Sequence, residues 1–162
     1  MRRELLIESR RHNATKLLRQ IPSIGPIRAA PLHALSQTPH RFRSKRRLWS
    51  YSGLALETSN NAEYRVVHGQ LKRSRKVLAI RGATKHHNRD LKNIFKGAAI
   101  RAAAVTGPFQ EFYAALVAKG MKPPMARLTL ARKIAAITLL VSKKGVRFDA
   151  DQLNPHDAPV RG

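Results

Sequence analysis

The apolar positions in the last third of the chain recur at helical spacing. After Pro108 they are Phe109, Phe112, Tyr113, Leu116 and Val117, and this series ends at Lys119–Gly120. A longer series follows Pro123–Pro124 and ends at Lys143–Lys144–Gly145. Its inward members are Leu128, Ala131, Ile134, Ala135, Thr138 and Val141. Both series predict amphipathic helices that supply the core, with Arg132 and Lys133 on the polar side of the second.

The middle of the chain predicts one more helix and a small β element. A helix is expected from near His87, with Leu91, Ile94, Phe95, Ala98 and Ala102 on one face. The polar run Glu57–Glu63 predicts an exposed loop. The short β-type runs Tyr64–Val67 and Val77–Ile80 predict a hairpin-like insertion around residues 64–80.

The first third predicts three helices separated by turns. Residues 2–20 form a charged helix that Pro22 ends, and a second helix runs from Pro26 to about Leu35. In the second, Ile27, Ala30 and Leu35 are expected to face inward, and Pro31 to kink or shorten it. Ser44 is the expected N-cap of a third helix that Gly53 stops. We therefore expect a mainly α fold with one domain over residues 1–150 and a flexible tail over residues 151–162.

The turn between the first two helices predicts an anion site. The run Ile21-Pro22-Ser23-Ile24-Gly25 joins two helices, and Pro26 suits a first helical turn. The pattern is that of a helix–hairpin–helix module over residues 17–35, with Ser23 where the usual Leu-Pro-Gly-Ile-Gly-x-x-x-Ala has its first glycine. An ordinary helical corner is the alternative. Free N–H groups at such a turn suit a phosphate, so the candidate binding residues are Ser23, Ile24, Gly25, Ile27 and Arg28.

The charge balance points to a polyanionic partner. The 162 residues include 32 Lys and Arg against 9 Asp and Glu, a formal net charge of +23. No acid lies between Glu8 and Glu57, and only Asp90 and Glu111 lie between Glu63 and Asp149, so no carboxylate cluster is available to neutralise the basic surface or to bind a catalytic metal. A membrane is the rival anion, but we find no apolar run of about 20 residues and no signal peptide. Further candidate nucleic-acid contacts are Arg41, Arg43, Lys45, Arg46, Arg47, Lys72, Arg73, Arg75, Lys76, Lys85, Arg89, Lys92 and Lys96.

Aromatic residues are interleaved with the first group of these cations. Phe42, Trp49 and Tyr51 flank or enter the basic run, and this mixture predicts contacts with both the backbone and the bases of a nucleic acid. A solvated helical face is the alternative. The histidines have no metal-ligand spacing, and no cysteine is present. Ser52 and Ser59 are candidate serine nucleophiles, each without a base to activate it.

The motifs, taken in order, resemble the C-terminal domain of the IS-one-ten family of insertion-sequence transposases. They are Ile21-Pro22-Ser23-Ile24-Gly25-Pro26-Ile27, Arg41-Phe42-Arg43-Ser44 to Tyr51-Ser52-Gly53-Leu54, Arg81-Gly82, His87-Asn88-Arg89-Asp90-Leu91-Lys92, Phe95-Lys96-Gly97-Ala98-Ala99 and Ala131-Arg132-Lys133-Ile134-Ala135. The resemblance implies DNA strand exchange, in which an acidic N-terminal domain binds divalent metal and a serine of the C-terminal domain attacks DNA. It also implies oligomers that work with a guide RNA.

Two departures limit what the resemblance implies. The acidic domain is absent from the sequence, so we expect no cofactor in this chain, and magnesium only together with that domain. The family's serine precedes an alanine in a loop, where this chain has Asn61 before Ala62. Asn cannot act as an oxygen nucleophile, which leaves Ser59 as the candidate catalytic residue. We interpret the chain as a truncated transposase and predict no strand transfer by it alone.

DNA is the expected partner. Guide RNA, a full-length transposase and a second copy of the chain remain open as further partners. A non-enzymatic basic RNA-binding protein and a regulator of the intact enzyme are the alternative functions. The expected location is the cytoplasm, in association with the nucleoid.

Overall fold

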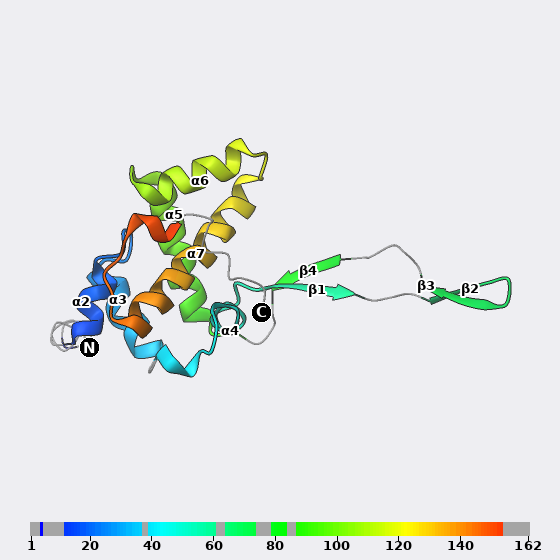
Figure 1. The fold of residues 1–162 in the computed structure, drawn as a ribbon, viewed down its shortest axis with the longest axis horizontal. Helices are drawn as coiled ribbons and strands as arrows, with labels where there is room; N and C mark the ends of the chain where they lie inside the picture. The colour runs from blue at the N-terminus through cyan, green and yellow to red at the C-terminus, as the bar shows by residue number, and fades with distance from the viewer. Residues whose placement is uncertain are drawn as a thin grey trace.

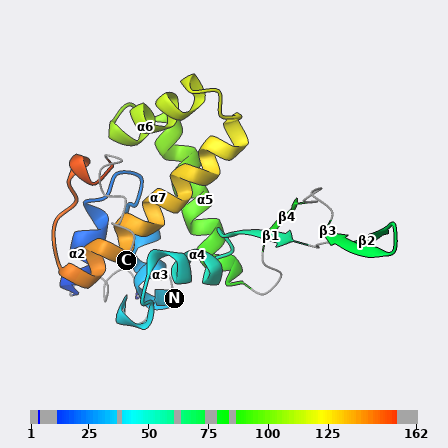
Figure 2. The same cartoon turned by 45° about the vertical axis from the view of Figure 1, so that its right-hand side comes forward.

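The computed structural model describes residues 12–36, 39–60, 64–73, 79–83 and 87–153, together with Glu4. These residues form a body of packed helices from which a narrow two-stranded ribbon projects (Figure 1). The ribbon stays clear of the helices in both views of the fold (Figure 2). The fold is mainly α, as the periodicity predicts.

Three helices from the second half of the chain build the centre of the body. They are α5 (Arg89–Ala104), α6 (Pro108–Ala118) and α7 (Pro123–Lys144). α7 crosses α5, and the predicted inward positions Leu91, Phe95 and Ile134 are fully buried between them. Gly145 ends α7 with a left-handed backbone, which matches the predicted stop.

Two shorter helices pack on the N-terminal side of this centre. They are α2 (Asn13–Arg19) and α3 (Pro26–Ser36), so the predicted second helix is confirmed and contains Pro31 without a break. Leu18 and Leu32 bury their side chains against the core. One inward assignment is wrong: Ile27 is 75% exposed, because the helical turn that faces the core carries Ala29, Ala30 and Leu32 instead.

A short helix and the start of α5 are tied together. α4 (Lys45–Tyr51) follows the 3-10 turn η1 (Pro39–Arg41). Ser44 is its N-cap, as predicted, with an extended backbone but no hydrogen bond from its side chain to the helix. The Asn88 N–H donates to the Tyr51 carbonyl at 2.7 Å, and the Asn88 side chain accepts from the Leu91 N–H at 3.0 Å. One asparagine therefore caps α5 and fixes the end of α4 beside it.

The ribbon consists of two antiparallel pairs. β1 (Leu56–Asn60) pairs with β4 (Ala79–Ala83), and farther from the helices β2 (Tyr64–Val67) pairs with β3 (Gln70–Arg73). The predicted loop Glu57–Glu63 is therefore wrong over residues 57–60, which are a strand, while residues 61–63 lie outside the described residues.

The insertion also pairs differently from the prediction. Tyr64–Val67 is a strand as expected, but its partner is the adjacent β3 across a turn at His68–Gly69, both of which have left-handed backbones. Such a turn closes a two-residue hairpin, so the nearest segment forms the partner. Of the predicted second run, Ala79 and Ile80 belong to β4 and pair with β1, whereas residues 77 and 78 lie outside the described residues.

The described chain ends against the helical body. The 3-10 turn η2 (Ala150–Leu153) buries Leu153, and the Phe148 ring lies 5.5 Å from the Phe109 ring of α6. The predicted division into residues 1–150 and a flexible tail stays a prediction, since residues 154–162 lie outside the described residues.

Candidate nucleic-acid interface

The turn between α2 and α3 is a tight one. The Ile24 N–H donates to the Ile21 carbonyl at 3.1 Å, with Pro22 in the second position and Ser23 in the third. Ser23 has φ +69°, the left-handed backbone that a turn of this kind requires at its third position. The helix–hairpin–helix pattern has glycine here, so Ser23 holds a strained version of the same turn.

The exit of this turn presents backbone donors. The Gly25 carbonyl accepts from the Arg28 and Ala29 N–H groups, so Gly25 occupies the N-cap position of α3. Among the described residues, no acceptor is recorded for the N–H groups of Gly25 and Ile27. They stand at the positive end of an 11-residue helix, where an anion is stabilised.

Cations surround this turn, which lines an open pocket. Arg19 of α2, Arg28 of α3 and Arg101 of α5 all contribute to the lining. Arg28 Nη1 donates to the Ser23 carbonyl at 3.2 Å, so this guanidinium also braces the turn. The structure thus brings the predicted residues 23–28 together and adds Arg19 and Arg101, which sequence reasoning did not include.

Replacing Ser23 with glycine is expected to stabilise the protein by about 1 kcal/mol. The left-handed backbone strains any residue with a Cβ by roughly 1–2 kcal/mol, and glycine's greater freedom in the unfolded chain offsets part of the gain. The buried Ser23 Oγ has no hydrogen-bond partner, so removing it adds to the gain. Urea unfolding of both proteins measures the difference, and a destabilised variant would show that the hydroxyl or the turn is described wrongly.

Around α4, aromatic rings hold cations in place. The Arg41 guanidinium lies 5.1 Å from the Phe42 ring centroid and 4.5 Å from that of Tyr51. Hydrogen bonds from Asn88 and from Arg41 lower the pKa of the Tyr51 hydroxyl from its usual value. The Asn88 amide lies 3.5 Å from that oxygen, so Tyr51 connects α4, α5 and the η1 segment.

Trp49 makes a similar arrangement with a distant part of the chain. The Arg132 guanidinium of α7 lies 4.5 Å from the indole centroid, and the indole Nε1 donates to the Arg132 carbonyl at 2.8 Å. Lys45 Nζ lies 5.8 Å from the same ring. Burial lowers the pKa of Arg132. Sequence reasoning placed Arg132 only on the polar side of its helix, because nothing in a pattern relates two residues 83 positions apart.

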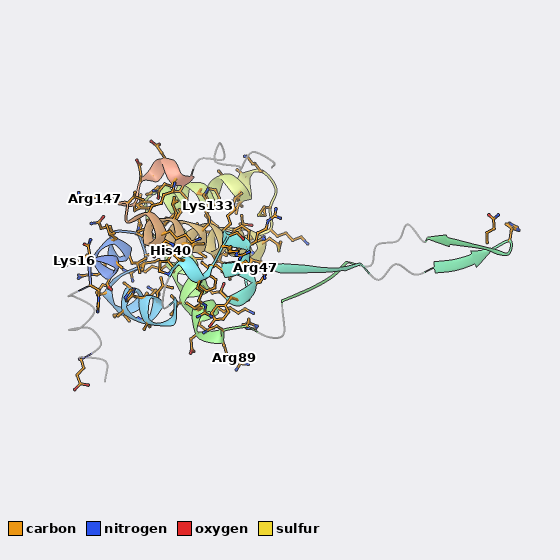
Figure 3. All side chains as sticks on the ribbon, turned by 60° about the horizontal axis from the view of Figure 1, so that its bottom comes forward. Lys16, His40, Arg47, Arg89, Lys133 and Arg147 are labelled. Atoms are coloured by element: carbon orange, nitrogen blue, oxygen red, sulfur yellow. The ribbon has the colours of Figure 1, made fainter. Side chains whose placement is uncertain are left out.

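The other predicted cations are spread over the molecule. Arg47 and Arg89 lie on the side of the body from which the ribbon leaves (Figure 3). Lys16 and Arg147, which are not among the predicted contacts, lie away from it. Arg46 is exposed on α4, and Arg43 is exposed just before that helix begins. The α5 helix carries Lys92 and Lys96, and β3 carries Lys72 and Arg73. The remaining predictions, Arg75, Lys76 and Lys85, lie outside the described residues.

The two cationic sites lie near opposite ends of α5. The turn reaches Arg101 in the last part of the helix, and α4 is tied to Asn88 at its start. At 1.5 Å per residue, these two positions are roughly 20 Å apart along the helix. The sites are therefore separate contacts on one body.

The structure gives the candidate serines different settings. Ser52 is fully buried, and its hydroxyl donates to the Leu48 carbonyl at 2.7 Å, so it cannot reach a substrate. Ser59 lies in β1 opposite Ile80, and its catalytic role stays a prediction. Asn61 lies outside the described residues.

A metal site is not formed by the described part of the chain. Within it, no three His, Asp or Glu side chains lie where they could hold an ion together.

Comparison with models of known protein families finds a match to a family of transposases. The model of the family described as "Transposase IS116/IS110/IS902 family" matches residues 15–114, which is more than half of the chain and spans the turn, α4, the ribbon, α5 and part of α6. No curated protein matches the sequence. In the part of the chain that the structure describes, no helix has the length and apolar character needed to cross a membrane. The chain belongs to the IS116/IS110/IS902 family of insertion-sequence transposases.

Proposed function

We propose that this chain is a nucleic-acid-binding part of an insertion-sequence transposase and that it holds DNA by its phosphates. The turn between α2 and α3 carries the proposal. It combines backbone N–H donors at the start of α3 with the guanidinium groups of Arg19, Arg28 and Arg101 around one open pocket. A phosphate is the group that fits such a set, because its oxygens accept several hydrogen bonds and its charge matches the helix end.

The exposed Ile27 supports an intermolecular role for this turn. Its side chain is 75% exposed at the start of α3, next to the Gly25 and Ile27 backbone N–H groups. It can pack on a sugar while the adjacent N–H groups hold the phosphate. The net charge of +23 supplies the long-range attraction that brings a polyanion to this surface.

The cations around α4 supply a second contact. Arg41 and Arg132 are held on aromatic rings, which restricts their movement before any ligand arrives. The two sites lie roughly 20 Å apart along α5, which is less than one helical turn of a DNA duplex. Phosphate contacts of this kind position the protein on DNA and carry no sequence information.

Placing a carboxylate at the turn tests the proposal. Gly25→Asp is expected to lower the affinity for a short DNA duplex by about tenfold or more, because the new charge occupies the phosphate position. The fold should tolerate the change, since a Cβ at Gly25 meets no atom within 4 Å and aspartate is a favoured N-cap. Fluorescence anisotropy with labelled duplex measures the affinity, and urea unfolding checks the fold.

Two control variants isolate the effect. Gly25→Asn has nearly the same shape and capping ability without the charge, so it should weaken binding much less. Ala115→Glu adds the same charge at an exposed position of α6 and should reduce affinity only slightly. If Gly25→Asp binds DNA no more weakly than Ala115→Glu, the turn does not hold a phosphate.

A further inference from the structure

Arg132 is fixed on Trp49 by two separate contacts. Its guanidinium covers the indole ring at 4.5 Å, and its backbone carbonyl accepts the indole N–H at 2.8 Å. The hydrogen bond ties the indole of α4 to the backbone of α7, and the guanidinium lies on the ring that this bond positions. The fold therefore supplies the ring on which this guanidinium rests.

The Arg132 guanidinium has an unused donor. Its Nε atom is buried and has no hydrogen-bond partner, and among the described residues no carboxylate pairs with it. The residue as a whole is only partly buried, so its guanidinium is a half-desolvated cation without a counterion among the described residues. Such a cation is stabilised when an anion approaches the part of the group that solvent can reach.

The neighbours of Arg132 suit a phosphate of a polymer. Lys45 lies near the same indole, and Arg46 and Arg47 follow it on α4. A guanidinium presents a planar fork that matches phosphate oxygens, and the Lys45 ammonium, 5.8 Å from the same ring, adds positive charge near it. The indole face that Arg132 covers is not available for a base to stack on.

We propose that Arg132, held on Trp49 with Lys45 beside it, binds a backbone phosphate of the nucleic acid at a site separate from the turn between α2 and α3. This inference rests on the proposed function and deepens it. Trp49 acts here as a positioning residue that holds a cation, in contrast to the base contact that the sequence predicts for the aromatic residues.

The test uses Arg132→Gln, with Arg127→Gln as the matched control. Arg127 is an exposed residue of the same helix, so both variants lose one charge from α7. With a labelled DNA duplex, Arg132→Gln should raise Kd by about fivefold to tenfold, whereas Arg127→Gln should raise it less than about twofold. Arg132→Lys keeps the charge without the fork and should fall between wild type and Arg132→Gln.

Trp49 provides a second readout, because it is the only tryptophan of the chain. Adding unlabelled duplex should change its fluorescence in the wild type and in Arg127→Gln, and much less in Arg132→Gln. If Arg132→Gln does not fold, the DNA affinity of Arg132→Lys replaces it in the test: a Kd above that of the wild type supports the phosphate contact, and an unchanged Kd contradicts it. Equal affinity and equal fluorescence change in the Arg132 and Arg127 variants would overturn this inference alone. Absence of duplex binding by the wild type would overturn the proposed function as well.

Discussion

Replacing Gly53 with alanine is expected to destabilise the protein by about 3 kcal/mol. Gly53 ends α4 with φ +68°, and a Cβ there would lie 2.6 Å from His87 Cγ. The backbone strain accounts for roughly 1–2 kcal/mol and the overlap for a similar amount. The clash separates α4 from the start of α5, where Asn88 joins them, so nucleic-acid affinity should fall as well. Urea unfolding measures the stability change.

Two further variants separate the strain from the overlap. Gly145 also ends a helix with a left-handed backbone, but a Cβ there meets no atom within 4 Å, so Gly145→Ala should cost only about 1–2 kcal/mol. His87→Ala in the Gly53→Ala background should restore part of the loss. Equal costs for Gly53→Ala and Gly145→Ala would show that His87 does not pack on Gly53 as described.

Binding to DNA is expected to weaken by roughly 10³-fold or more between about 50 and 200 mM salt. Each phosphate that a cation neutralises releases counterions, and six or more contacts give a loss of that size. The turn and the α4 region together offer that number through Arg19, Arg28, Arg101, Arg41, Lys45, Arg47 and Arg132. Anisotropy titrations over a salt series measure the slope.

An uncharged solute is the control for the salt series. Sucrose at matched osmolality should leave the affinity nearly unchanged, because it releases no counterions. A structured RNA measured in the same series distinguishes a general phosphate contact from a preference for duplex DNA. A loss of less than about tenfold over this salt range would contradict a binding surface built on phosphate contacts.

Most helices of the fold follow from local sequence pattern. Leu91, Phe95 and Ala98 repeat at helical spacing, and Gly145 marks a stop, so α5 and the end of α7 are predictable. β1 is not, because Glu57–Asn60 lacks the alternation of apolar and polar residues that marks a strand. Its strand character comes from pairing with β4, a segment about twenty residues away in the sequence.

The candidate interface, too, is predictable only where its residues are neighbours in the sequence. Residues 23–28 are adjacent in the sequence, and the Pro-Ser-Ile-Gly-Pro run alone predicts their turn. Arg101 and Arg132 reach the two sites only through the packing of α5 and α7. The exposure of Ile27 was also missed, since an apolar residue in a helical series is ordinarily assigned to the core.

The dependence of affinity on salt, compared between wild type and Gly25→Asp, tests the phosphate contact at the turn most directly. If Gly25 and its neighbours hold one phosphate, the variant should lose affinity and the slope of log K against log salt should become shallower by about 0.9. Ala115→Glu should keep the wild-type slope. Parallel lines for wild type and Gly25→Asp would mean that no phosphate contact is lost, and would contradict the proposal that this turn binds nucleic acid.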